Sequence, residues 1–164
     1  MKKDLVIKRK LFEIYGLPSA YADMSYEDTG LSKVKQEGIK KTIERAPAKG
    51  TLTIQGTAGP IVTQLINNGR KVRGIDFIAF SSNAFAEHTM PISDVVLLYN
   101  VGIEVSTNFN ISKQVFAKIR KYYTERNVLL IIETDLGKTD LLSKYDFRVT
   151  NFLRVPNKEE TIWV

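Results

Sequence analysis

Two kinds of apolar run alternate along the chain from about residue 50 onward. Short unbroken runs such as VVLLYNV and NVLLIIE are typical of strands buried on both faces of a sheet. Between them lie segments whose apolar residues recur every three or four positions, as in an amphipathic helix. The pattern predicts strands at residues 51–55, 75–81, 94–101, 127–133 and 147–155. It predicts helices at about residues 60–68, at 112–126 and, as a short turn, at 140–144.

Strands that alternate with helices in this way predict an α/β fold, a three-layer sandwich around a mainly parallel five-stranded sheet. The first third of the chain is expected to be helical instead. Residues 5–16 predict a short helix that Pro18 ends, and Ser32 is a candidate cap for a second helix that runs to about Arg45. Residues 1–49 are therefore interpreted as a helical lead-in to one domain that spans residues 1–164.

Composition narrows the chemistry. The 164 residues include no cysteine and a single histidine, which excludes disulfides and thiolate catalysis and leaves little for a metal site. No apolar run approaches the roughly 18 residues of a membrane span, so we expect a cytoplasmic protein with no membrane partner. The net charge of +6 is compatible with a nucleic-acid partner and equally with a basic surface that keeps the protein soluble.

Residues 51–63, TLTIQGTAGPIVT, predict a strand, a glycine-bearing turn and the start of a helix. A phosphate-binding P-loop, G-x-x-x-x-G-K-[ST], occurs in this setting. Laid over the chain, the pattern finds its first glycine at Gly56 and its last hydroxyl at Thr63. Its second glycine and its lysine are replaced by Ile61 and Val62. Gly59 preserves a second flexible position in the turn.

The order of motifs resembles the ATPase domain of bacterial replicative-helicase loaders, which belong to the AAA+ class of P-loop ATPases. The matching segments, in chain order, are LPSAY at 17–21, SYED at 25–28, GTLTIQG at 50–56, DVVLLYNVGIE at 94–104, RKY at 120–122 and VLLIIETDL at 128–136. The resemblance covers most of the chain, from about Tyr15 to Val155. It implies a P-loop fold and a role in DNA replication.

The departures from that family all remove phosphate chemistry. Val62 stands where the family has the lysine that contacts the phosphates, and Ile61 stands where a glycine lets the backbone approach them. Tyr99 and Asn100 replace the two acids of the family's Walker B strand. Phosphoryl transfer depends on charge neutralisation by lysine and Mg²⁺ and on a water-orienting acid. We therefore expect a pseudo-ATPase that is not an enzyme and holds neither cofactor nor metal.

The resemblance places the family's sensor position at Thr134 or Asp135. Thr63 keeps a hydroxyl that could bind Mg²⁺, although a bond to its own helix backbone is the expected use. Glu133, Asp135 and Asp140 follow the fourth predicted strand, where they could hold a metal, be solvated or cap a helix. The family's helical DNA-contacting piece between the second and third strands has no equivalent, because only residues 82–93 separate those strands.

Two further groups of side chains are candidates for binding. Basic residues on the predicted helix 112–126 and in the turn before the second strand could contact nucleic acid or form ordinary solvated surface: Lys113, Lys118, Arg120, Lys121, Arg126, Arg70, Lys71 and Arg73. Phe85 and Trp163 are apolar residues in segments where polar ones are expected. They could complete the core or contact a partner chain.

The leading hypothesis is a catalytically inactive, loader-like protein in the DNA replication of a phage, plasmid or mobile element. It would contact a replicative helicase, a helicase loader or an initiator protein, with weak DNA binding or assembly into an oligomer as further options. One alternative is a basic accessory DNA-binding protein. The other is a nucleotide-binding enzyme whose phosphate site has been rebuilt.

Overall fold

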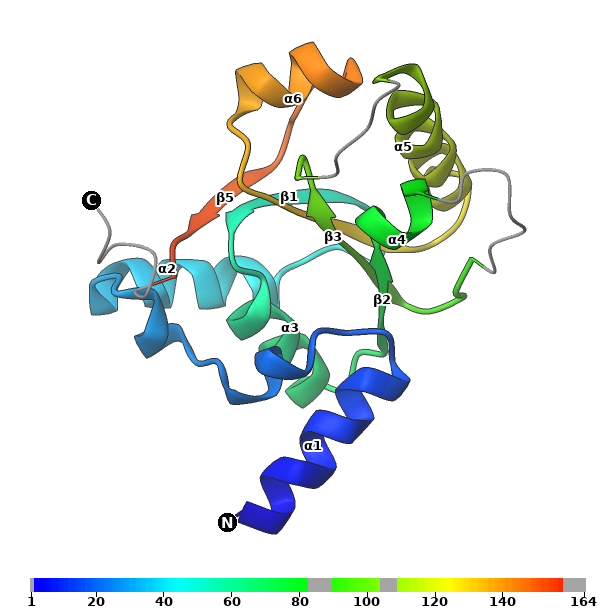
Figure 1. Cartoon of the computed structure of the whole chain (residues 1–164). Coiled ribbons are helices and arrows are strands. Elements are labelled where there is room, and N and C mark those ends of the chain that lie inside the picture. The colour runs from blue at the N-terminus through cyan, green and yellow to red at the C-terminus, as the bar shows by residue number, and fades with distance from the viewer. Residues whose placement is uncertain (1, 83–89, 104–108, 158–164) are drawn as a thin grey trace.

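The computed structural model describes residues 2–82, 90–103 and 109–157. Its centre is one sheet in the order β2-β3-β4-β1-β5, with every neighbouring pair parallel (Figure 1). The strands are β1 (Gly50–Gly56), β2 (Val72–Asp76), β3 (Val95–Val101), β4 (Leu129–Thr134) and β5 (Phe152–Val155). The α/β class and the five-stranded parallel sheet predicted from the apolar runs are confirmed.

Helices cover both faces of the sheet. On one side lie α1 (Lys2–Ile14), the short 3₁₀ helices η1 (Ser19–Asp23) and η2 (Tyr26–Thr29), α2 (Lys33–Glu44) and α3 (Gly59–Asn67). On the other side lie α4 (Phe77–Ser82), α5 (Phe109–Thr124) and α6 (Lys138–Tyr145). Alternate residues of β3 enter the two cores: Val95 and Leu97 face the first group, and Val96 and Leu98 face the second. The sandwich therefore has three layers, as predicted.

The second strand lies earlier in the chain than predicted, at Val72–Asp76 instead of residues 75–81, and residues 77–82 form α4. Residues 77–94 therefore separate β2 from β3, and not residues 82–93 alone as predicted. The Asp76 carboxylate accepts a hydrogen bond of 3.0 Å from the backbone N–H of Ile78, which caps the first turn of this helix. The Phe77 ring is fully buried and packs edge-on against Phe116 and Tyr145. Capping by Asp76 and burial of Phe77 favour a helix in a sequence that reads as β-rich.

The fifth strand starts later than predicted, at Phe152 instead of residue 147. Asp146 adopts a left-handed conformation with φ of 56° and ends α6, and the next residue turns into the core. The Phe147 ring is buried on the opposite side of the sheet from α2, and its centre lies 5.5 Å from the centre of the Phe116 ring. Residues 147–151 therefore lead to the sheet edge without pairing, and β5 pairs with β1 over four residues.

The lead-in is attached to the edge strand β2 by a close approach of two backbones. The N–H of Gly74 donates to the carbonyl of Tyr15 at 2.9 Å, and Gly16 has a φ of 73°. A Cβ atom on either glycine would clash with the carbonyl oxygen of the other. Both positions therefore require glycine, and the lead-in covers the outer edge of β2.

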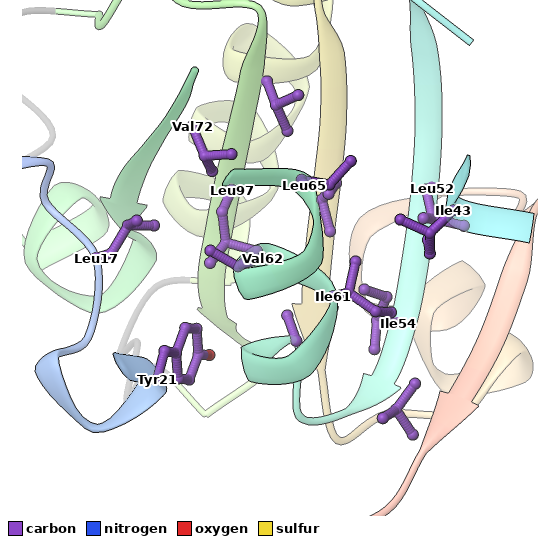
Figure 2. Packing of buried hydrophobic residues seen from close by; sticks show 14 of the residues in the cluster. Leu17, Tyr21, Ile43, Leu52, Ile54, Ile61, Val62, Leu65, Val72 and Leu97 are labelled. Carbon is purple, nitrogen blue, oxygen red and sulfur yellow. The ribbon is translucent and has the colours of Figure 1, made fainter. Parts of the chain in front are cut away.

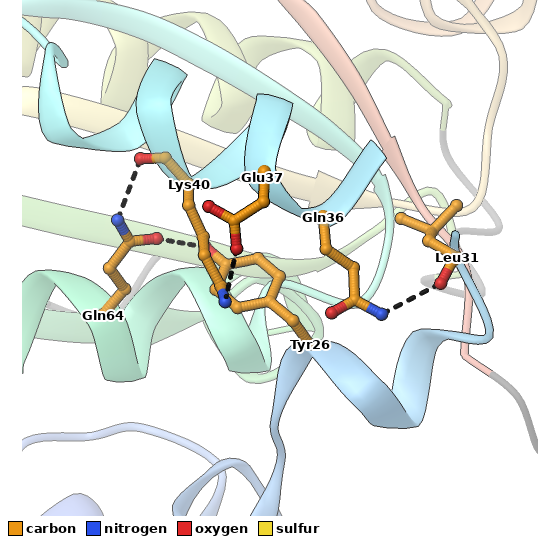
Figure 3. A network of polar contacts seen from close by, with 6 residues as sticks. All are labelled: Tyr26, Leu31, Gln36, Glu37, Lys40 and Gln64. Atoms are coloured by element: carbon orange, nitrogen blue, oxygen red, sulfur yellow. Dashed lines mark hydrogen bonds and ion pairs between the residues drawn. The ribbon is translucent and has the colours of Figure 1, made fainter. Parts of the chain in front are cut away.

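A polar network joins η2 and α2 of the lead-in to α3 (Figure 3). The Tyr26 hydroxyl donates to the Gln64 side chain, whose amide donates in turn to the Lys40 carbonyl at 2.9 Å. The Ser32 hydroxyl accepts from the Lys35 N–H, so the predicted cap of α2 is present. The bonds of Gln64 fix η2 and α2 against the middle of α3. No helix within the described ranges is long and apolar enough to cross a membrane.

Candidate functional site

The turn between β1 and α3 occupies the place where the sequence predicts a degenerate phosphate loop. Gly56 has a φ of 113°, and a Cβ there would clash with the carbonyl oxygen of Val155. A Cβ on Gly59 would clash with the side chain of Met24 from the lead-in. Both glycines are therefore explained by packing within the protein. Neither needs a phosphate to account for it.

The residues that replace the lysine and glycine of a P-loop are core residues. Ile61 and Val62 lie in the first turns of α3 and are fully buried among Leu17, Ile54 and Leu97 (Figure 2). The Thr63 hydroxyl donates to the carbonyl of Tyr21 at 3.2 Å. The expectation that Thr63 bonds its own helix is therefore wrong, because η1 packs close enough to supply the acceptor.

The backbone donors of the turn already have acceptors within the chain. The N–H of Thr57 donates to the Val155 carbonyl at 2.8 Å, and that of Gly59 donates to the Thr57 hydroxyl at 3.2 Å. Pro60 has no N–H. The N–H of Ala58, at the amino end of α3, donates to a carboxylate oxygen of Glu133 at 2.6 Å. Residues 57–60 therefore offer no unused N–H to a phosphate group.

The contact between Glu133 and this turn was not predicted from the sequence. Glu133 follows the buried run of β4, which pairs with β1 in a register that aligns Ile54 with Glu133. Its carboxylate also accepts the Tyr21 hydroxyl, so it bridges α3 and the lead-in. A negative charge here is favoured by the partial positive charge at a helix amino end. The one advance signal was its place at the carboxyl end of a parallel strand.

The carboxylate also changes the lead-in tyrosine. Burial raises the pKa of the Tyr21 hydroxyl far above its usual value, and the charge and hydrogen bond of Glu133 add to this effect. The pKa of Tyr99 is raised as well, first by burial and then by Asp76 and Glu133. Both hydroxyls therefore stay protonated at neutral pH. Tyr21 remains a hydrogen-bond donor to the carboxylate.

The Walker B position is occupied by a bulge. Asn100 adopts a left-handed conformation with φ of 61°, and its side-chain amide donates to Asp76 at 3.1 Å. The Thr134 hydroxyl donates to the Val101 carbonyl at 2.7 Å and accepts from the Leu136 N–H at 3.0 Å. Of the two candidate sensor residues, the exposed Asp135 is the one whose side chain reaches solvent.

A shallow cleft of about 360 Å³ lies in front of the turn, and its charged lining residues are Glu133 and Asp135. The candidate nucleotide-site residues Gly56, Tyr99 and Asn100 line the same cleft, together with Tyr21 and Met24. Arg154 lines an adjoining hollow that shares Gly56 and Asp135. A triphosphate in this cleft would be repelled by the two carboxylates, and no cation of the cleft lining would offset that repulsion. In the described part of the chain no group of acidic and histidine side chains is arranged to hold a metal.

The basic candidates divide into arginines packed against the protein and exposed lysines. The Arg120 guanidinium lies 4.1 Å from the Phe147 ring centre, and burial lowers its pKa. Arg126 stacks on Tyr122, Arg73 stacks on Tyr15, and Arg70 donates to the carbonyls of Ala46 and Pro47. The side chains of Lys71, Lys113, Lys118 and Lys121 are exposed.

The two tyrosines that lie among the basic residues of α5, Tyr122 and Tyr123, are not free to stack on nucleic-acid bases. Tyr123 is 1% exposed and donates to the Pro91 carbonyl at 2.8 Å, while Arg126 covers Tyr122. Arg70, just before β2, and Arg73, within β2, contact the layer that contains α1 and α2, and α5 lies on the other face of the sheet. Phe85 and Trp163, the candidate partner contacts, lie outside the described residues.

No protein-family model and no curated protein matches the sequence. Solved structures do match the fold. The crystal structure of DnaI has a TM-score of 0.59 at 12% identity over 87% of this chain and 94% of that one. A DNA replication initiation factor gives 0.54 at 13% identity over 86% of this chain and 52% of its own length.

A putative primosome component from Streptococcus pyogenes serotype M3 gives a TM-score of 0.51 at 11% identity, over 86% of this chain and 91% of that one. At such low identities the likeness establishes the fold alone. The chain therefore shares the three-layer α/β fold of these proteins.

Proposed function

We propose that this chain is a non-catalytic protein of DNA replication that has kept the fold of a loader-type ATPase and lost its nucleotide cycle. It acts through contacts with a replicative helicase, a helicase loader or an initiator protein, in a phage, plasmid or other mobile element. The replication context is supported by the fold shared with DnaI, a replication initiation factor and a primosome component.

The observation that carries the loss of nucleotide binding is the bond from the Ala58 N–H to Glu133. In a phosphate loop the amino end of the helix supplies donors to an anion from outside. Here the protein supplies the anion itself, on a rigid strand, at 2.6 Å. A nucleotide would have to displace Glu133 and then bind beside the negative charge of Asp135. No lysine would help it, because the position of the P-loop lysine holds the buried Val62. Each of these steps is unfavourable.

A thermal unfolding series tests the loss of nucleotide binding. ATP and ADP, each at millimolar concentration with Mg²⁺, are expected to leave the melting temperature unchanged. A ligand that binds the native state must stabilise it, so a rise of several degrees with either nucleotide would contradict the proposal. Inorganic phosphate at the same ionic strength is the control, because it separates nucleotide binding from a general anion effect.

The partner half of the proposal needs its own measurement. The purified chain is mixed in turn with the replicative helicase, the helicase loader and the initiator protein of its host, without nucleotide. We expect co-elution with one of them in size-exclusion chromatography. If the chain elutes alone in all three mixtures, the proposed mode of action is wrong.

DNA binding is a second candidate function. The observation in its favour is the row of lysines at positions 113, 118 and 121, which are exposed on α5 and form no ion pair with any described carboxylate. Salt-dependent binding of this kind would accompany the protein contacts, and it would be weak because three lysines neutralise few phosphates.

A further inference from the structure

A groove lies between α2 and the edge strand β5. It combines an apolar floor, basic side chains and an unpaired strand edge, which together suit the binding of a peptide segment. Two hollows of about 680 Å³ each share Thr42 and Leu153 as lining residues, so they adjoin along the helix. Figure 1 shows α2 beside β5 at the outer edge of the sheet. None of the residues proposed for the degenerate nucleotide site lines the groove. The second of its two hollows shares Arg154 and Pro156 with the hollow at Gly56.

The floor of the groove is apolar. Ile39 and Ile43 supply it from α2, Leu52 from β1 and Leu153 from β5. The Phe152 ring lies on the other face of the sheet, near Lys138 of α6. Leu153 is half-buried in the chain by itself, so apolar area remains to be covered. Hollows of this size accept several side chains of a bound ligand.

The charges of the groove all have one sign. Lys35, Lys41, Arg45 and Arg154 line it with exposed side chains, and no aspartate or glutamate does. In the described part of the chain none of these four cations forms an ion pair. The acids of α2 lie elsewhere: Glu37 pairs with Lys40 on the side of the helix that faces Tyr26 (Figure 3).

The edge of β5 adds hydrogen-bonding groups. At the other edge of the sheet, Tyr15 already bonds to Gly74 of β2, so the lead-in covers that strand. Within the described ranges no element pairs with the outer side of β5, whose partner is β1. An edge strand of this kind presents backbone N–H and C=O groups that an added strand can use.

We propose that this groove binds an acidic, apolar segment of a partner protein, with its apolar side chains on the floor and its carboxylates against the basic rim. The inference rests on the proposed function, because it gives the protein–protein contact a place and a chemistry. Single-stranded DNA fits less well, because the floor is mainly aliphatic and offers no exposed stacking platform comparable to those of base-binding proteins.

A peptide selection tests the proposal without knowledge of the partner. The full-length chain is presented with a random phage library of peptides about twelve residues long, and selected peptides are synthesised with a fluorescent label. We expect sequences that combine aspartate or glutamate with large apolar residues. No enrichment, or enrichment of basic or uncharged sequences, would overturn the proposal.

Matched charge variants then locate the site. The pair Lys41→Glu and Arg45→Glu is expected to weaken binding of the selected peptide at least about tenfold. The control pair Lys113→Glu and Lys118→Glu changes the net charge equally on α5 and is expected to leave affinity unchanged. Equal losses in the two variants would show a general charge effect and exclude the groove. All four side chains are exposed, so both variants are expected to fold, which circular dichroism verifies.

Other occupants give different results. Tighter peptide binding by a chain that ends at Asn157 would show that residues 158–164 compete for the groove, which contradicts a partner segment. A concentration-dependent dimer that the Lys41→Glu, Arg45→Glu pair dissociates would assign the groove to a second copy. Competition by an oligothymidine would assign it to DNA. If ATP or ADP stabilised the protein, the proposed pseudo-ATPase would be wrong and the proposed peptide groove would be unaffected. The failures of the two proposals are therefore distinguishable.

Discussion

Glu133 lies at the amino end of α3, where a phosphate loop would bind an anion from outside the protein. It takes the Ala58 N–H and the Tyr21 hydroxyl, and it places a fixed negative charge at the amino end of α3. In a catalytic site, an acid held for chemistry often costs stability. In a packing role, the same acid contributes stability. Its removal therefore distinguishes the two uses.

We predict that Glu133→Gln destabilises the protein by about 1–2 kcal/mol, because a charge-assisted hydrogen bond and a favourable helix-end charge are lost while the shape is kept. Urea unfolding of the purified variant measures the change. Asp135→Asn is the matched control, since Asp135 lines the same cleft but is exposed, and its effect is expected within about 0.5 kcal/mol. A stabilised Glu133→Gln variant would favour a functional acid instead.

Tyr21 makes the stability of this region dependent on alkaline pH. Burial, followed by Glu133, raises its pKa above the ordinary value of 10.0, so above that pH the unfolded chain releases a proton that the folded chain retains. Stability is therefore complete below about pH 10 and falls as pH rises, by up to about 1.4 kcal/mol per pH unit for one tyrosine.

Tyr21→Phe removes this contribution and is expected to reduce the alkaline slope by about one proton in urea unfolding at a series of pH values. Burial also raises the pKa of Tyr26 and Tyr123, so a slope remains in the variant. Tyr26→Phe is expected to reduce the slope as well, because burial alone raises the pKa of Tyr26. An unchanged slope in Tyr21→Phe would contradict the proposed protonation.

At the scale of elements, the sequence predicted what depends on local pattern. The runs in β3 and β4 are buried on both faces, and Ser32 caps α2 as its position indicates. The prediction failed at residues 77–82, where apolar composition fits a strand and a buried helix equally. The Asp76 cap distinguishes them, and it was a readable signal.

The side-chain contacts of the candidate site could not be predicted, because they join residues that are far apart in the sequence. The sequence alone shows Val62, Tyr99 and Asn100 where a P-loop ATPase would have a lysine and two acids. The bond between Ala58 and Glu133 joins residues 75 positions apart and depends on the order of strands in the sheet. Arg120 gives a similar case, because its place under Phe147 depends on a segment that the pattern assigned to a strand.

The glycine pair that attaches the lead-in to β2 is the element-scale contact most open to test. Gly74→Ala introduces a methyl group that clashes with the Gly16 carbonyl, and the expected cost is about 1–3 kcal/mol. Hydrogen exchange of α1 and η1 is expected to accelerate, because the lead-in loses its edge contact. Gly38→Ala, on an open face of α2, is the control and is expected to stabilise by up to about 1 kcal/mol. Equal effects would exclude the proposed attachment.

At the scale of the whole molecule, the net charge of +6 is spread over both layers. Arg70 packs on the loop after α2 and Arg73 of β2 packs on Tyr15, while the lysines of α5 lie on the opposite face of the sheet. A single duplex therefore meets few of these cations at once. The basic character suits solubility and weak polyanion binding more than a dedicated DNA groove.

We predict DNA binding that is weak and governed by Lys113, Lys118 and Lys121. Three phosphate contacts give a slope of about −3 when the logarithm of the binding constant is plotted against that of the salt concentration. Fluorescence anisotropy with a labelled duplex measures the slope, and replacing the three lysines with glutamine is expected to abolish it. The Lys41→Glu, Arg45→Glu variant serves as the charge control and is expected to keep most of it. A slope steeper than about −6, or one that survives the α5 variant, would place the DNA contact elsewhere and favour the accessory DNA-binding alternative.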